Sequence, residues 1–429
     1  MISVDISKLN NVTVDEEWNF SDKSEIAMHG IHAYPAKFPA FIASKAFEFA
    51  RKEGVSVQTV ADIFCGCGTV SLEAKLHEKS FWGCDINPVA ALIARTKSAC
   101  YIVKELDTLY GKIKHSFDQE SIPSDIYACS NERIIYWFTE NSYNDLYRLK
   151  NSIINSTAKG KYRDAFFCLF SSILKASSKW LTKSIKPQLD PTKGEISVFS
   201  LFTLQYQKFI KSVQQINKFN LCATATKVDN RNFLSIKKLP KVDMIISSPP
   251  YVTSYEYADL HQLSIMWLDY AADYRDVRKG TIGSIYNSND YSVKLTKLNS
   301  IGRKIVDDLL DDLGSIAKVR SVARYYLDMQ KVIKKCSGML NDNGLAFFVV
   351  GDTEYKGIKI KNSEHLIQCL IDEGFSDIKA AKRRVSRKLL TPYRDDCGRF
   401  SSDKTKRTVY HEEYIISGRI FHHGQNSDN

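Results

Sequence analysis

The sequence lacks the long apolar runs of a membrane protein. Although 44% of its 429 residues are hydrophobic, no stretch of 18 or more apolar residues occurs, and a membrane-spanning helix needs about 20. The first twenty residues also lack the charged-then-apolar pattern of a secretory signal peptide. We therefore expect no association with a membrane and a cytoplasmic location.

Cysteine patterns typical of zinc modules are absent as well. The ten Cys are scattered singly, apart from Cys65 and Cys67, whereas structural zinc sites use paired CxxC spacing. His29 and His32 lie three positions apart, but no third ligand follows at a suitable spacing. We accordingly expect no metal site.

Acidic residues are outnumbered by basic ones. The chain has 60 Lys and Arg against 49 Asp and Glu, a net charge of +11, and residues 101–240 alone hold 21 Lys and Arg against 12 Asp and Glu. This balance suits a polyanionic partner such as a nucleic acid, although many basic proteins bind none.

The apolar runs that are present alternate with helical patterns. VQTVADIF (57–64) leads through a glycine turn into a helical segment, and FWGCDI (81–86) leads through Asn87-Pro88 into another. Strand patterns resume at 241–248 and at 344–352. This alternation predicts an α/β fold with a parallel sheet.

Two long stretches interrupt this alternation. Residues 101–220 carry aromatic-rich helical patterns, and residues 252–320 are irregular and rich in Tyr, Asp and Lys. The remaining predicted elements follow the second stretch: a helix at 321–339, a helix at 365–375, and strands near 376–386 and 412–419. The pattern predicts one sheet domain with a large helical insertion.

The first glycine turn has the features of a nucleoside site. In Cys65-Gly66-Cys67-Gly68 the glycines allow a ligand to approach the backbone, and the following helix N-terminus favours an anionic group. Asp85 ends the next strand, where a carboxylate can accept hydrogen bonds from ribose hydroxyls. Ser71 stands where a dinucleotide site would have its third Gly, so a mononucleoside fits better than NAD. The alternative is a structural turn with a surface Asp.

The tetrapeptide Ser248-Pro249-Pro250-Tyr251 follows a predicted buried strand. Two prolines stiffen the loop, so the Ser248 hydroxyl and the Pro249 carbonyl can both accept from one amino group. The Tyr251 ring offers a surface for stacking a planar base. The alternative is an ordinary Pro-Pro turn, but average residue usage would produce this tetrapeptide in only roughly one of several hundred such chains.

DIFCGCG (62–68), DINP (85–88), SPPY (248–251) and HAYPAKFP (32–39) together resemble the motifs of amino-methylating DNA methyltransferases of bacterial restriction–modification systems. The resemblance implies a Rossmann-like sheet of seven strands, mostly parallel with one antiparallel strand. It also implies S-adenosylmethionine as cofactor, DNA as substrate, a possible cognate restriction endonuclease as partner, and a bacterial or archaeal cell.

The resemblance also assigns residues to roles. Lys37 would meet the methionine carboxylate of the cofactor, and Asp229 would meet its adenine amino group. The implied catalytic residues are Ser248, Pro249, Pro250 and Tyr251. The implied cofactor-binding residues are Tyr34, Pro35, Ala36, Lys37, Phe38, Asp62, Phe64, Gly66, Gly68, Asp85, Ile86, Asp229 and Asn230.

The domain organisation follows from these motifs. The catalytic core would consist of residues 28–100, 221–254 and 321–420, and the insertions at 101–220 and 255–320 are both candidates for DNA recognition. The basic run at 381–407 would contact phosphates or form a solvated strand and loop.

The target atom is predicted less directly. Within the family, Ser at the first motif position is associated with cytosine N4, and Asp more often with adenine N6. No Pro-Cys dipeptide occurs, which removes the usual nucleophile for methylation of a cytosine ring carbon. We therefore predict methylation of cytosine N4. The alternatives are an adenine-N6 enzyme, an RNA amino-methyltransferase and a catalytically silent DNA-binding relative.

Overall fold

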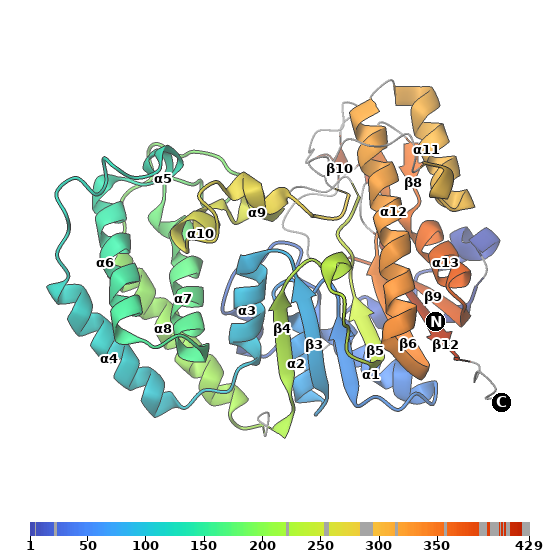
Figure 1. Ribbon diagram of the computed structural model, residues 1–429, viewed down its shortest axis with the longest axis horizontal. Helices are drawn as coiled ribbons and strands as arrows, with labels where there is room; N and C mark the ends of the chain where they lie inside the picture. The colour runs from blue at the N-terminus through green and yellow to red at the C-terminus, as the bar shows by residue number, and fades with distance from the viewer. Residues whose placement is uncertain are drawn as a thin grey trace.

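The computed structural model describes residues 1–4, 6–20, 24–219, 223–252, 257–283, 295–313, 316–355, 358–385, 393–394, 403, 405, 407–408 and 412–422. A twisted sheet stands at the centre, with helices on both faces, and a group of helices extends from one edge of it (Figure 1).

The sheet has eight strands in the order β1-β9-β12-β6-β5-β2-β3-β4. Strands β4, β3, β2, β5 and β6 are parallel neighbours, whereas β12 runs antiparallel to both β6 and β9. The strands are β1 (Ile2–Ser3), β2 (Thr59–Asp62), β3 (Ser80–Asp85), β4 (Thr226–Asn230), β5 (Val242–Ser247), β6 (Leu340–Val350), β9 (Phe375–Arg384) and β12 (Glu412–Ile420).

This arrangement confirms the predicted α/β sheet of seven strands with one antiparallel member, β12. The eighth strand, β1, is a two-residue edge strand antiparallel to β9, and the polar N-terminal sequence did not indicate it. Two short pairs lie outside the sheet: β7 (Thr353–Tyr355) with β8 (Ile358–Ile360), and β10 (Tyr393–Arg394) with β11 (Arg407–Thr408).

Each central strand is buried on both faces. Val60 and Met244 point to one face and Ala61 and Ile245 to the other, because successive side chains of a strand alternate. The first face packs against α1 (Ala40–Lys52), α2 (Thr69–Leu76) and α3 (Pro88–Ser98). The second packs against α11 (Ser300–Leu313), α12 (Ile316–Met339) and α13 (Asn362–Asp372).

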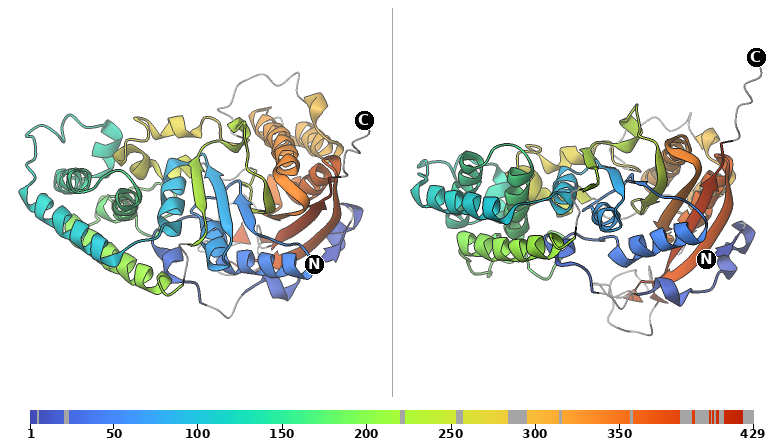
Figure 2. Two further views of the ribbon diagram at one scale, coloured as in Figure 1. Left: turned by 60° about the horizontal axis from the view of Figure 1, so that its bottom comes forward. Right: turned by 90° about the horizontal axis from the view of Figure 1, so that it is seen from below.

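The insertion between β3 and β4 is helical. Its aromatic core includes Phe166, Phe170 and Phe202, all fully buried, and it packs on the sheet domain through α3 and α7. The helices are α4 (Val103–Gln119), α5 (Glu132–Trp137), α6 (Glu140–Ser156), α7 (Lys161–Ser177) and α8 (Val198–Ile216). The left view of Figure 2 shows these helices on the side of the sheet where β4 is the edge strand, with α3 between them and β4.

Residues 257–283, which we call the strap, run along the carboxyl ends of the parallel strands (Figure 1). They form α9 (Tyr257–Leu260), α10 (Gln262–Trp267) and η6 (Tyr274–Arg278). These helices and α11 correct the prediction of an irregular stretch over 252–320, whose short helical turns lack a clear apolar period. Residues 253–256, 284–294 and 314–315 of that stretch, and most of the basic run at 381–407, lie outside the described residues.

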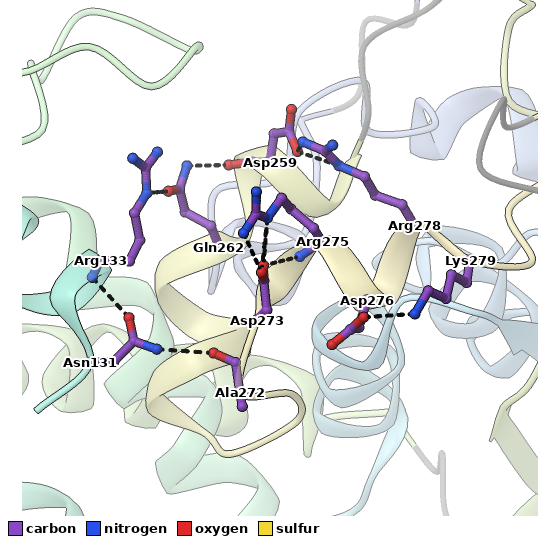
Figure 3. A network of polar contacts seen from close by, with 10 residues as sticks. All are labelled: Asn131, Arg133, Asp259, Gln262, Ala272, Asp273, Arg275, Asp276, Arg278 and Lys279. Atoms are coloured by element: carbon purple, nitrogen blue, oxygen red, sulfur yellow. Dashed lines mark hydrogen bonds and ion pairs between the residues drawn. The ribbon is translucent and has the colours of Figure 1, made fainter.

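Polar contacts hold the strap to the insertion (Figure 3). Asn131 Nδ2 donates to the Ala272 carbonyl at 3.1 Å, and Arg133 Nε donates to Gln262 Oε1 at 2.9 Å. At the other end of the strap, Ser321 Oγ on α12 donates to the Gly283 carbonyl at 2.8 Å. The strap therefore connects the insertion to α12 across the carboxyl edge of the sheet. In the described part of the chain, no helix has the length and apolar character needed to cross a membrane.

Candidate functional site

The two glycines of the first turn serve different purposes. Both have left-handed backbones, with φ of +47° at Gly66 and +75° at Gly68. A Cβ at Gly68 would lie 2.6 Å from the Ala94 Cα, so this position needs Gly to let α2 approach α3. A Cβ at Gly66 would meet the Tyr34 ring at an ordinary 3.6 Å. Gly66 thus presents bare backbone toward the N-terminal segment.

Asp85 ends β3 and is bound to this turn. Its Oδ2 accepts from the Gly66 backbone N–H at 2.9 Å, and its Oδ1 accepts from the Asn87 N–H at 2.8 Å. Removal from water raises the pKa of Asp85 to about 6, against the lowering effect of these two hydrogen bonds. A carboxylate oxygen has more than one lone pair, so each oxygen keeps a site for a hydroxyl donor.

Asp62 ends β2, the strand beside β3. Its Oδ1 accepts from the Ser247 hydroxyl at 2.6 Å and from the Phe64 N–H at 3.1 Å. Burial raises the pKa of Asp62 to about 7, and these hydrogen bonds oppose the rise. Because Ser247 immediately precedes the SPPY tetrapeptide, the hydrogen bond between Ser247 and Asp62 joins the end of β5 to the end of β2.

The N-terminal segment 34–38 lies over the glycine turn. The Tyr34 ring is next to Gly66 and packs on the ring of His261, with 5.1 Å between ring centroids. Lys37 Nζ contacts Glu25 Oε2 at 2.5 Å. The predicted contact of Lys37 with a cofactor carboxylate stays a prediction, and it would compete with this ion pair.

His261, on the strap, was not among the predicted site residues. Its Nδ1 lies 2.8 Å from the Asn87 side-chain nitrogen, while Asn87 Oδ1 caps α3 by accepting from the Val89 N–H at 3.0 Å. Burial lowers the pKa of His261 to about 3, so the ring is neutral and accepts the Asn87 hydrogen. No local sequence motif indicates a role for His261, because the residues that it contacts are distant in sequence.

The end of β4 completes this side of the site. Asp229 Oδ2 accepts from Trp82 Nε1 at 3.1 Å. Asn230 Nδ2 donates to the Asp85 and Ile86 carbonyls at 2.9 and 3.0 Å. Asn230 therefore fixes the backbone that carries Asp85.

The strap borders the same strand ends. Asn232 Nδ2 donates to the Gly280 carbonyl at 2.8 Å, and a Cβ at Gly280 would lie 3.2 Å from Ile86 Cδ1. An ion pair within the strap joins Arg278 and Asp259 at 2.5 Å (Figure 3). These contacts place the strap directly beside the predicted cofactor residue Ile86.

The SPPY tetrapeptide follows β5 at the same sheet edge. The Ser248 hydroxyl donates to the Val349 carbonyl on β6 at 2.9 Å. The Tyr251 hydroxyl donates to Glu413 Oε1 on β12 at 2.6 Å. Burial and the Glu413 carboxylate raise the pKa of Tyr251 well above its usual value, so the phenol stays protonated. Glu413 was not predicted, because it is 162 positions away in the sequence.

Because β5, β2 and β3 are neighbours in the sheet, their carboxyl ends bring the predicted groups to one edge. Ser248, Asp62 and Asp85 come together there, each at the end of its own strand, with Tyr34 and Gly66 beside them. The roles assigned to individual residues remain predictions.

Two curated proteins are similar to the chain over long stretches. The type II methyltransferase M.MvaI of Kocuria varians is 24% identical over 358 residues, which are 77% of this chain and 78% of that protein. The type II methyltransferase M.BsoBI of Geobacillus stearothermophilus is 27% identical over 255 residues, 52% of this chain and 48% of that protein. The chain resembles type II methyltransferases. No family model matches it.

Solved structures give a weaker comparison. A precorrin-6y C5,15-methyltransferase from Geobacter metallireducens has a TM-score of 0.30 at 9% identity, covering 91% of this chain and 94% of that chain. The rRNA methyltransferase aviRa from Streptomyces viridochromogenes also has a TM-score of 0.30, at 8% identity, covering 92% and 90%. These scores are too low to carry an argument.

The observed sheet order and the two sequence relatives together indicate a methyltransferase that uses S-adenosylmethionine. The carboxyl edge fits this cofactor, because both Asp85 oxygens retain acceptor capacity for ribose hydroxyls.

Proposed function

We propose that the protein is a site-specific DNA methyltransferase of the restriction–modification type that methylates the exocyclic N4 amino group of cytosine. The two relatives are type II methyltransferases by name, and the motifs at the carboxyl edge of the sheet match the chemistry. A cognate restriction endonuclease is the partner that this assignment leads us to expect.

The hydrogen bond of Ser248 is the observation that carries the proposal. A serine hydroxyl has one proton, and Ser248 donates it to the Val349 carbonyl at 2.9 Å. Its remaining capacity is that of an acceptor. Ser248 is therefore prepared to receive a hydrogen from an incoming amino group rather than to donate one.

The Pro249 carbonyl would supply the second acceptor. With both amino hydrogens held, the nitrogen lone pair is turned away from conjugation with the base ring and becomes nucleophilic. The bound cofactor supplies a methyl group on a positively charged sulfur. The amine nitrogen forms the new N–C bond as the S–C bond breaks, and its surplus proton leaves to an acceptor or to water. Holding the amine in line accounts for much of the rate.

The base would reach these acceptors only outside the duplex, as in other enzymes that modify bases. Tyr251 would then stack on it. The basic insertion lies beyond the edge strand β4, and the strap runs along the carboxyl ends of the strands (Figure 1); we propose that both contact the DNA. The choice of cytosine N4 over adenine N6 rests on Ser248, because an Asp is more usual for adenine.

The test is mass spectrometry of nucleosides from cells that express the protein. We expect N4-methylcytosine in DNA with the wild type and none with Ser248→Ala. Ser337→Ala is a matched control, because Ser337 also donates to a backbone carbonyl, that of Lys334, but lies near the end of α12 that precedes β6. N6-methyladenine alone would contradict the base assignment. Methylated RNA with unmodified DNA would contradict the assignment of DNA as the substrate. Binding of S-adenosylmethionine without any methylation would favour a catalytically silent DNA-binding relative.

A further inference from the structure

We propose that Glu413 and Arg383 are positioning residues that fix the ring of Tyr251, the surface on which the target base stacks. This inference rests on the proposed function, because it assigns the pair a part in holding the base for methyl transfer. Glu413 belongs to no motif that the sequence singled out. Arg383 belongs to the basic run 381–407, but it is buried and paired with Glu413 rather than exposed for phosphate contact.

A chain of three side chains carries the inference. The Tyr251 hydroxyl donates to Glu413 Oε1 at 2.6 Å, and Arg383 Nη1 lies 3.2 Å from the other oxygen, Oε2. Glu413 and Arg383 are directly opposite each other in the antiparallel register of β12 and β9. Glu413 is therefore held from two sides by groups on rigid elements.

Burial makes this pairing costly to break. The Arg383 side chain is 2% exposed and that of Glu413 is 17% exposed. A buried guanidinium that loses its acidic partner is left with an uncompensated charge. The ion pair with Arg383 therefore holds the Glu413 carboxylate between Arg383 and Tyr251. The carboxylate in turn restricts the position of the tyrosine hydroxyl.

The hydroxyl end of the ring also lies close to the backbone after β6. A Cβ at Gly351 would lie 3.1 Å from Tyr251 Cζ, so a larger residue there would require the ring to shift by a few tenths of an ångström. One contact holds the ring against the backbone and the other tethers its hydroxyl. Such restraint keeps a stacked base in one orientation, which an in-line displacement requires.

The pair also reaches the element that follows the predicted cofactor segment. The Arg383 guanidinium carbon lies 5.7 Å from the centre of the Phe41 ring, in the first turn of α1. Residues 34–38 lead directly into this helix. The Tyr251–Glu413–Arg383 chain thus also rests on the first turn of α1.

The experiment combines Tyr251→Phe with changes at Glu413. Single-turnover transfer of a labelled methyl group to DNA would be measured for Tyr251→Phe, Glu413→Ala, Glu413→Gln and the double variant Tyr251→Phe/Glu413→Ala. Glu412→Gln is the matched control, because Glu412 lies next along β12, on the other face, and pairs with Lys382 at 3.8 Å. S-adenosylmethionine binding by calorimetry shows that each variant is folded.

We expect Tyr251→Phe and Glu413→Ala each to slow methyl transfer about tenfold or more, the loss that corresponds to one charge-assisted hydrogen bond. The double variant should be no slower than the slower single variant. Glu413→Gln should recover part of the rate, because its amide oxygen can still accept from Tyr251. Cofactor affinity should be unchanged in every variant, and Glu412→Gln should behave as the wild type.

Independent losses that multiply in the double variant would overturn the inference, because Glu413 would then act without Tyr251. So would a slow Glu413→Ala variant whose cofactor affinity falls to the same extent, because that result indicates a general structural role. A wild-type protein that methylates no DNA would contradict the proposed function itself, so the two failures are distinguishable.

Discussion

Replacing Gly68 with Ala should destabilise the protein more than the same replacement at Gly54. The two glycines have almost the same left-handed backbone, with φ of +75° and +72°. No atom of the described residues lies within 4 Å of a Cβ built at Gly54, whereas one built at Gly68 would be 2.6 Å from the Ala94 Cα. The pair therefore separates the conformational cost of a left-handed Ala from the cost of a backbone clash.

The magnitudes follow from these two terms. A left-handed Ala costs roughly 1–2 kcal/mol, which is the whole loss expected for Gly54→Ala. Overpacking adds roughly 1–3 kcal/mol, because α2 and α3 must move apart, so Gly68→Ala should lose about 2–5 kcal/mol. Gly66→Ala should lose no more than Gly54→Ala, since its nearest neighbour is the Tyr34 ring at 3.6 Å.

Urea unfolding followed by circular dichroism measures these losses of stability. Calorimetry with S-adenosylmethionine measures the cofactor affinity of the Gly66→Ala variant. Gly66→Ala should weaken cofactor binding with little further loss of stability, because its methyl group would fill space between the glycine turn and the ring of Tyr34, a predicted cofactor-binding residue. Equal destabilisation by Gly54→Ala and Gly68→Ala would refute the packing argument. Unchanged cofactor affinity in Gly66→Ala would refute the placement of the cofactor loop.

Three further predictions concern the surroundings of the site. The folded-state pKa of Asp62 is raised to about 7, so the stability that it contributes is present below its unfolded pKa near 4 and is lost as the pH rises to 7. Between pH 5 and pH 7.5, the unfolding free energy of the wild type should therefore fall by about 2–3 kcal/mol more than that of Asp62→Asn, which has no carboxyl group to ionise. Urea titrations at the two pH values measure this difference. His261→Ala should weaken S-adenosylmethionine binding by about 0.5–1.5 kcal/mol, the value of an aromatic pair, because Tyr34 loses its ring contact. Calorimetry measures this loss, and His115→Ala, at an exposed histidine, is the control. Equal affinities of the two variants would count against this role of His261. Arg278→Met should break the ion pair within the strap and speed amide hydrogen exchange there, and unchanged exchange would show that the pair does not restrain it.

Much of the fold could be predicted because its signals are local. The apolar runs that became β2, β3, β5 and β6 each end at Gly, Asp or Pro, and this pattern indicates a buried parallel strand followed by a turn. The aromatic periodicity of the insertion predicted helices, but it did not show that α5 and α6 are separate helices divided at Thr139. There Thr139 caps α6 by accepting from the Ser142 N–H at 3.3 Å.

The rest depends on contacts between distant parts of the chain. Glu413 and Arg383 look like ordinary members of amphipathic strands, and only the pairing of β12 with β9 puts them beside Tyr251. His261 could not be predicted either, since its contacts with Tyr34 and Asn87 depend on the path of the strap. Asp62, Asp85 and Ser248 could be placed from sequence because each lies at the end of its own strand, whereas their supporting partners could not.

The most direct test of the central claim uses the purified protein, DNA and S-adenosylmethionine whose methyl group carries deuterium. After digestion of the DNA, mass spectrometry should find deuterated N4-methylcytosine with the wild type and not with Ser248→Ala. Deuterium at a ring carbon of cytosine, or equal N4 labelling by Ser248→Ala, would contradict the account in which Ser248 holds the amino group during transfer.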